Sequence, residues 1–220
     1  MVRGRTAHLF CPTGLLDDVW WHRSYWVFGR VWKSGAGGYY QSGRFAPAGR
    51  PMVFDENRVC SFGRKPEYYR WTTPMEYMLY ASDKQPQVLK AGKNRKRSRL
   101  GAMPPTTIRT DWRRDVPILV RAMVLAGETL ILAGPADLFD ERKTQNTLDT
   151  PETQKLLAKQ VSILEGSEGA ILWAVSIADG QKLTEQKLNG LPVFDGMIAA
   201  GGRLYYATID GRVICLGSTR

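Results

Sequence analysis

Short segments rich in apolar residues, separated by turn-forming residues, recur along the C-terminal half of the chain. Residues 118–134 (ILVRAMVLAGETLILAG) predict two strands around a turn at 126–128. From AILWAVSI at residue 170 to RVICLG at residue 217, two Asp-Gly turns and one Ala-Gly-Gly turn separate apolar-rich segments. This spacing predicts a regular meander, in which four short strands form one antiparallel sheet.

One phrase of this pattern occurs twice. Residues 122–134 read AMVLAGETLILAG and residues 196–208 read GMIAAGGRLYYAT, which align without a gap at an offset of 74 residues. Met123 aligns with Met197, Leu130 with Leu204, and Ala133 with Ala207. A repeated strand–turn–strand phrase predicts an architecture built from copies of one β unit.

A helical pattern interrupts the strands between residues 135 and 167. Thr150 is a candidate N-cap, Pro151 suits the first helical position, and Glu152 stands in the first turn. Residues at helical spacing follow, namely Leu156, Leu157, Gln160 and Ile163 or Leu164. We expect one short helix, inserted between strands.

The N-terminal half has a different composition. Residues 1–82 are rich in aromatic side chains and contain strand-like segments, among them a hairpin at 54–63 with its turn at 55–57. Residues 83–115 are basic and lack apolar periodicity, which predicts a long exposed loop. A four-stranded antiparallel sheet of this size has the dimensions of one blade of a β-propeller. We therefore divide the chain into an aromatic-rich blade region (1–82), a basic loop (83–115), and two C-terminal blades (116–220) that carry the helical insertion at 135–167.

Charge is distributed unevenly between the two halves. Residues 1–114 contain 21 Lys and Arg against 8 Asp and Glu, whereas residues 115–220 contain 10 against 13. The run KAGKNRKRSR at 90–99 is compatible with a nucleic-acid or anionic surface. Because it shows no helical periodicity, we favour a solvated loop over nucleic-acid binding. No apolar run is long enough for a membrane span, and the cysteines lack the spacing of a metal or redox site.

The densest group of chemically versatile residues lies at 17–26, DDVWWHRSYW. Its candidate ligand-binding side chains are Asp18, Trp20, His22, Arg23 and Trp26. A carboxylate and an imidazole can exchange protons, and tryptophan faces can stack on a planar ligand. On a strand, however, alternate residues point to opposite faces, so the group is divided. We favour packing between blades, keep ligand binding open, and assign no catalytic or metal-ligating residue.

The segment LWAVSIADGQKLTEQKLNGLPVFDGMIAAGGRLYYATIDGRVICLG resembles a quinoprotein-like (pyrroloquinoline-quinone-like) β-propeller repeat. The matching positions are Ala174, Asp179-Gly180, Asp195-Gly196, Gly202 to Tyr205, and Asp210 to Val213. Residues 122–134 match the middle of a second blade, and residues 54–63 match a hairpin of a third. The resemblance implies an all-β fold of four-stranded antiparallel blades in an incomplete ring, and a place in the C-terminal part of a large bacterial protein with a periplasmic or other extracytoplasmic location. It also implies that the partners are missing N-terminal blades or another protein chain.

The chain departs from that family at one informative position. The family's dehydrogenase repeats place a tryptophan four residues after the turn glycine, whereas Thr184 stands there in this chain. We therefore expect no cofactor and a non-catalytic scaffold or binding module that presents blade-end loops to a protein or small-ligand partner. The alternative is part of a quinone-dependent dehydrogenase, which implies pyrroloquinoline quinone held with Ca²⁺ by carboxylate and amide oxygens.

Overall fold

The computed structural model describes residues 8–12, 24–28, 47–65, 77–85, 87–88, 106–107 and 109–217. The described part is mostly β-structure, in antiparallel sheets that each have two to four strands. This confirms the all-β fold class. The chain divides into two compact units, residues 1–73 with 80–113 and residues 74–79 with 114–220.

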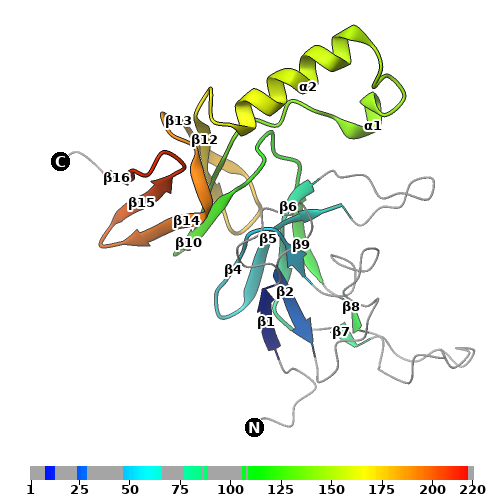
Figure 1. Cartoon of the computed structure of the whole chain (residues 1–220). Helices are drawn as coiled ribbons and strands as arrows, with labels where there is room; N and C mark the ends of the chain where they lie inside the picture. Colours follow the sequence, from blue (N-terminus) through cyan, green and yellow to red (C-terminus); the bar gives the residue numbers. More distant parts are fainter. Residues whose placement is uncertain are drawn as a thin grey trace, which may run out of the picture. The chain divides into compact units, whose positions relative to one another are not determined.

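The strands up to residue 114 form three sheets (Figure 1). One sheet has the order β1-β2-β3, a second has the order β4-β5-β6-β9, and β7 pairs with β8. Their bounds are β1 His8–Pro12, β2 Ser24–Phe28, β3 Ala48–Gly49, β4 Met52–Phe54, β5 Arg58–Arg64, β6 Tyr77–Asp83, β7 Gln87–Val88, β8 Thr106–Thr107 and β9 Thr110–Arg114.

The hairpin expected at 54–63 is present. β4 pairs antiparallel with β5, and Phe54 lies opposite Val59. The Asp55 carboxylate closes the turn, because its Oδ1 accepts hydrogen bonds from the backbone N–H groups of Asn57 and Arg58, both at 2.7 Å. An aspartate at this position stabilises a turn through its own side chain, which explains why the sequence predicted this hairpin.

The second unit contains two further sheets and the helical insertion (Figure 1). A four-stranded sheet has the order β10-β11-β12-β13, and a three-stranded sheet has the order β14-β15-β16. The elements are β10 Ala122–Ala126, β11 Thr129–Gly134, α1 Glu141–Thr144, α2 Pro151–Leu164, β12 Ala170–Ser176, β13 Lys182–Leu188, β14 Pro192–Ala200, β15 Arg203–Thr208 and β16 Val213–Leu216.

The sheet boundary differs from the one predicted. The segments after residue 170 do not form one meander, because β12 and β13 complete the sheet that β10 and β11 begin, while β14, β15 and β16 form a sheet of their own. β11 pairs directly with β12, with Gly134 opposite Ile171, although the helical insertion separates them in sequence. The turn-forming residues before and after β13 are equally strong signals, and they do not show where one sheet ends and the next begins. The prediction from strand spacing therefore assigned β12 and β13 to the wrong sheet.

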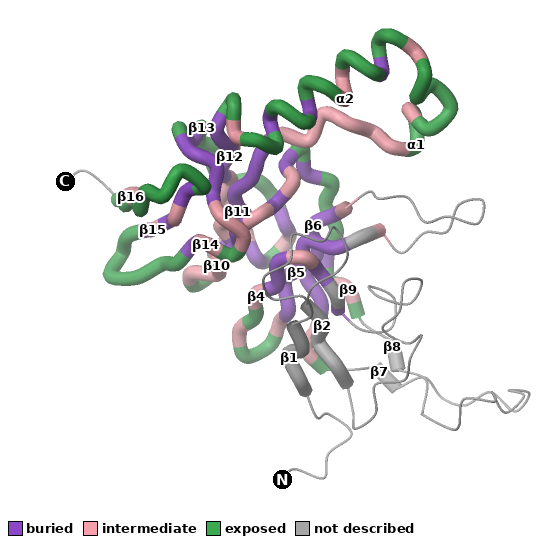
Figure 2. The backbone as a smooth tube through the Cα atoms, in the orientation of Figure 1, coloured by how far each residue is buried: buried purple, intermediate pink, exposed green. Residues whose placement is uncertain are grey.

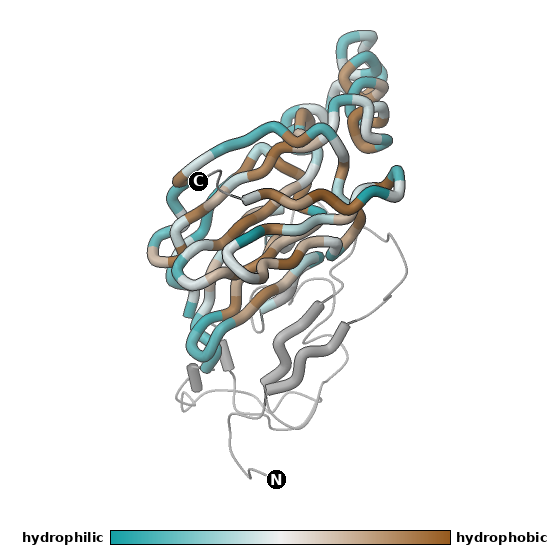
Figure 3. Tube along the Cα trace, turned by 90° about the vertical axis from the view of Figure 1, so that its left-hand side faces the viewer, coloured by the Kyte–Doolittle hydropathy of each residue, from teal (hydrophilic) through white to brown (hydrophobic). Residues whose placement is uncertain are grey.

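The helix expected near Thr150 forms with the predicted start. The Thr150 side chain accepts a hydrogen bond from Thr153 N, and Pro151 is the first residue of α2. Gln160 and Ile163 are buried as their spacing predicted, while Leu164 is exposed. Figure 3 shows hydrophobic and hydrophilic positions alternating along this helix, in keeping with one buried face. The single turn α1 was not predicted.

The two sheets of the second unit pack face to face around a shared apolar cluster. The four-stranded sheet contributes Ala122, Ala133, Ala170, Leu172 and Leu188, with Val124 and Ile131 at the margin. The three-stranded sheet contributes Met197, Leu204 and Tyr206, with Ile214 and Leu216 at the margin, and Leu191 enters from the connection. β10 and β14 run close together along this interface.

Candidate functional site

Most of the ligand-binding group suggested by the sequence cannot be placed. Asp18, Trp20, His22 and Arg23 lie outside the described residues, as does the basic run 90–99. Trp26 is within β2, where its backbone pairs with that of Phe10 in β1. These residues therefore remain candidates from the sequence alone.

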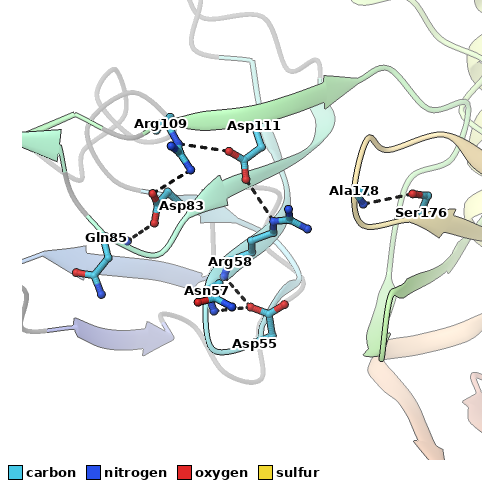
Figure 4. A network of polar contacts seen from close by, with 9 residues as sticks. All are labelled: Asp55, Asn57, Arg58, Asp83, Gln85, Arg109, Asp111, Ser176 and Ala178. Atoms are coloured by element: carbon cyan, nitrogen blue, oxygen red, sulfur yellow. Dashed lines mark hydrogen bonds and ion pairs between the residues drawn. The ribbon is translucent and has the colours of Figure 1, made fainter.

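A network of charged side chains ties together strands β5, β6 and β9 (Figure 4). Asp111 binds Arg58 through one oxygen (3.4 Å to Nε) and Arg109 through the other (3.5 Å to Nε). Arg109 also contacts Asp83, with 3.3 Å between Nη2 and Oδ2. The carboxylates alternate with the arginines, so each charge is matched within the network. Its arrangement suits a structural role at the end of the sheet.

The described residues offer no group of three or more histidine, cysteine, aspartate or glutamate side chains that could hold a metal ion. Cys60 lies next to the charged network but is fully buried in β5. Burial raises the pKa of its thiol to about 12, and the nearby Asp55 carboxylate adds to the increase. The thiol therefore stays protonated at neutral pH, which makes it a poor nucleophile.

The feature that suggests a function is one face of the β14-β15-β16 sheet, which we call the open face. It is formed by Ile198, Tyr205, Ala207, Val213 and Cys215. The strand register places Ile198, Tyr205 and Cys215 in one cross-strand row, and Ala207 opposite Val213 in the next row. Ile198 is 61% exposed and Val213 is 74% exposed, while Cys215 is also exposed. Tyr205 and Ala207 on the central strand β15 are half-buried, and exposed and intermediate positions alternate along β16 (Figure 2).

The repeated phrase gives every residue of the open face a counterpart in the other sheet. The 74-residue offset relates Ile198 to Val124, Tyr205 to Ile131, and Ala207 to Ala133. Strand pairing extends the relation, because Leu172 lies opposite Ala133 as Val213 lies opposite Ala207. In the same way, Ala174 lies opposite Ile131 as Cys215 lies opposite Tyr205.

The difference in exposure between counterparts is largest for Leu172 and Val213. Ala133 and Leu172 are 0% and 6% exposed because the three-stranded sheet covers them. Val213, the counterpart of Leu172, is 74% exposed. Equivalent faces of the two sheets therefore differ: the face of the four-stranded sheet is covered, and the corresponding face of the three-stranded sheet is not.

The sheets stack in one direction. The face of the three-stranded sheet that enters the interface carries Met197, Leu204 and Tyr206. Their counterparts in the four-stranded sheet are Met123, Leu130 and Leu132. These residues lie on the face that points away from the interface, and they too are buried. The contact therefore joins unlike faces of two copies, as in a head-to-tail stack.

The turn before β16 is held by a compact polar group. The Asp210 carboxylate accepts hydrogen bonds from Thr208 Oγ1 and from Arg212 Nε (2.9 Å), and its Oδ2 lies 2.6 Å from Arg212 Nη2. The hydrogen bonds from Arg212 and then Thr208 lower the pKa of Asp210 to about 2. The turn thus keeps a negative charge at physiological pH and fixes the start of β16.

The last strands of the two sheets differ in chemistry. β13 carries Lys182, Glu185 and Lys187, and Lys182 Nζ lies 2.7 Å from Glu185 Oε2. Lys182 also lies over the Trp173 ring, at 4.7 Å from its centroid. β16 reads Val-Ile-Cys-Leu and has no charged side chain. Charges on an edge strand discourage pairing with other strands, so β13 is a protected edge and β16 is not.

The expected difference from dehydrogenase repeats involves this protected strand. Thr184 is exposed on β13, opposite Ala174 of β12. Trp173, one residue before Ala174, points to the other face and donates a hydrogen bond to Glu185 Oε2 at 2.9 Å. The Trp173 indole therefore lies on the opposite face of the sheet from Thr184.

No family model and no curated protein matches this chain. Within the described residues, no helix is long and apolar enough to cross a membrane. The open face was not recognised from the sequence, although its signal was present. Side chains alternate between the two faces of a strand, so the doubled phrase places Ile198 and Val124 on equivalent faces of their sheets. The sequence does not show where the first sheet ends, and this decides whether Val124 or Ile198 is covered by a neighbouring sheet.

Proposed function

We propose that this protein is a non-catalytic scaffold or binding module of the quinoprotein-like β-propeller type. The observation that carries the proposal is the open face, an exposed apolar surface whose counterpart in the preceding repeat is covered. Contiguous exposed apolar patches on proteins mark interaction sites. The partner is a missing propeller blade or another protein chain.

The repeat architecture supports this role over a self-contained catalytic site. In stacked repeats each unit is stabilised mainly by its immediate neighbours, so an uncovered terminal face is the position at which another element adds. The polar turn Thr208–Arg212 and the hairpin between β14 and β15 hold this face in a fixed geometry. A preformed surface loses little conformational entropy when a partner binds.

Photo-cross-linking from the open face tests the binding role. A maleimide carrying a photoreactive group is attached beyond the end of β16 through Gly217→Cys, with Cys11→Ser and Cys215→Ser to avoid other labels. We expect one defined cross-linked polypeptide from the native source, which excess unlabelled protein competes away. The Ile198→Lys protein should not compete, whereas Leu183→Lys, a substitution on the exposed edge strand β13, should compete fully. Equal competition by both variants would contradict a role for the open face.

The enzymatic alternative is tested separately by reconstitution. The protein is mixed with pyrroloquinoline quinone and Ca²⁺, and quinone reduction is followed by absorbance with a panel of alcohols and aldose sugars. Under our proposal no turnover appears. Turnover that Asp18→Asn or His22→Ala abolishes would replace the scaffold role with an enzymatic one.

A further inference from the structure

We propose that the open face docks one further antiparallel β-sheet of the same repeat, which presents an apolar face of the Met197, Leu204 and Tyr206 type. The inference rests on the proposed binding function and specifies the chemistry of its partner. It follows from continuing the observed stack by one step. The four-stranded sheet receives such a face from the three-stranded sheet, and the open face is the equivalent surface one repeat later.

The side chains of the open face match a surface that already accepts this kind of sheet. Ile198 stands in the place of Val124, and Val213 in the place of Leu172. Val124 and Leu172 both pack against the cluster that contains Met197, Leu204 and Tyr206. The two central rows of the open face carry no charge, so an apolar partner surface meets no unpaired charge on binding.

The open face also differs from its counterpart in volume, which narrows the partner's chemistry. Tyr205 stands where Ile131 does, Cys215 where Ala174 does, and Ile198 where Val124 does, so all three residues of this row are larger than their counterparts. Overfilling a packed interface is destabilising. A docking sheet with smaller side chains opposite the Tyr205 row therefore binds best, and an unmodified copy of residues 189–217 binds the open face more weakly than it binds the four-stranded sheet.

A second copy of this chain does not supply the docking face. Met197, Leu204 and Tyr206 are already buried against the four-stranded sheet. Their counterparts Leu130 and Leu132 are both 0% exposed, and Met123 is also buried. Two copies that meet through their identical open faces form a symmetric contact, which is not a continuation of the stack.

A tethered repeat tests the proposal on the full chain. The protein is extended after Arg220 by a flexible glycine–serine linker and a second copy of residues 189–217. Cys11→Ser in the host and Cys215→Ser in the appended copy leave host Cys215 as the accessible thiol. The readout is the rate of alkylation of Cys215 by N-ethylmaleimide in native buffer, followed by mass spectrometry. Tethering supplies a high effective concentration, so even weak docking is detectable.

We expect the appended sheet to slow alkylation of host Cys215 by at least about tenfold, which corresponds to about 1.4 kcal/mol of docking free energy. The matched control carries Leu204→Lys and Tyr206→Lys in the appended copy only, and its alkylation rate should return to that of the unextended chain. Equal protection by the control would overturn the proposal, because it would show nonspecific shielding.

A peptide of residues 189–217 with Cys215→Ser, added separately to the unextended chain, provides a second measurement. If neither the tether nor the peptide slows alkylation, the proposal is overturned. It is also overturned if Cys215 of the unextended chain becomes protected as protein concentration rises together with dimer formation in sedimentation, since a second copy then covers the face. Loss of docking with retention of the photo-cross-link rejects only the sheet chemistry and leaves the binding function standing.

Discussion

Cys60 and Cys215 both lie within β-strands, yet their surroundings are opposite. Cys60 is buried beside Asp55, which together with desolvation raises its pKa to about 12. Cys215 is exposed on the open face. We expect N-ethylmaleimide to modify Cys215 readily at pH 8 and to leave Cys60 unmodified until the protein unfolds. Peptide mass mapping after native labelling measures this, and rapid native labelling of Cys60 would contradict its burial.

The raised pKa of Cys60 also predicts how stability depends on pH. A thiol that ionises near 9.0 when unfolded and near 12 when folded stabilises the fold fully below pH 9, and this contribution is lost as pH rises towards 12. Between pH 8 and pH 10 the free energy of unfolding should fall by about 1.4 kcal/mol more in the wild type than in Cys60→Ala. Urea denaturation at the two pH values measures the difference. Parallel behaviour of the two proteins would rule out the shift.

Asp210 titrates in the opposite sense. Hydrogen bonds from Arg212 and Thr208 lower its pKa to about 2 from an ordinary value of 3.8. Its contribution to the turn is therefore complete above pH 4 and is lost as pH falls towards 2. The carboxyl carbon of Asp210, followed by NMR, should shift with a midpoint near 2, and Arg212→Gln should move that midpoint upwards. An unchanged midpoint would mean that Arg212 is not the main cause.

At the scale of single elements, two glycines with similar backbones differ in the room around them. Gly127 in the β10–β11 turn and Gly169 before β12 have φ of 59° and 72°. A Cβ on Gly127 meets nothing within 4 Å, whereas a Cβ on Gly169 falls 2.2 Å from Leu188 O. Gly127→Ala should cost about 1–2 kcal/mol from the backbone conformation alone. Gly169→Ala should cost at least about 3 kcal/mol, because the backbone must also shift. Thermal denaturation of the pair separates the two effects.

The Gln160 side chain links helix α2 to the connection after β11. The Gln160 amide accepts a hydrogen bond from Leu138 N at 2.7 Å and donates one to Ala136 O at 3.0 Å. Gln160→Leu keeps the size of the buried side chain and leaves both backbone groups without this partner, so we expect a loss of about 1–3 kcal/mol. Hydrogen exchange at the Leu138 amide should accelerate. Lys159→Leu on the exposed side of α2 is the control and should leave that amide unchanged.

At the scale of the molecule, equivalent positions in the two sheets should respond differently to the same change. Leu172 and Val213 occupy corresponding places in the strand register, but only Leu172 is covered. Leu172→Lys buries an unpaired charge and should cost at least about 3 kcal/mol, whereas Val213→Lys should change stability by no more than about 0.5 kcal/mol. Urea denaturation of both variants provides the comparison. Similar losses would show that the open face is covered within the chain.

Much of the second unit was predictable because its signals are local. The Thr150 cap and Pro151 fixed the start of α2, and the Asp55–Asn57 turn fixed a hairpin of the first unit. The grouping of strands into sheets was not predictable, since pairing of β11 with β12 across the insertion depends on long-range contacts. The open face could not be identified for the same reason. Its exposure depends on how the strands are grouped into sheets and on which sheet covers another. The group at Asp18–Trp26 remains a sequence-based prediction.

The long connection between β11 and β12 has a practical consequence for engineering. Gly134 and Ile171 are paired although α1 and α2 both lie between them in sequence. The entropic cost of closing a loop grows slowly with its length, so additional residues in this connection should destabilise the sheet only slightly. The stretch from Gln145 to Asp149 is exposed, between two helices that make their own caps. A fluorescent protein or an epitope inserted there would report on the molecule while leaving the surfaces of both sheets free.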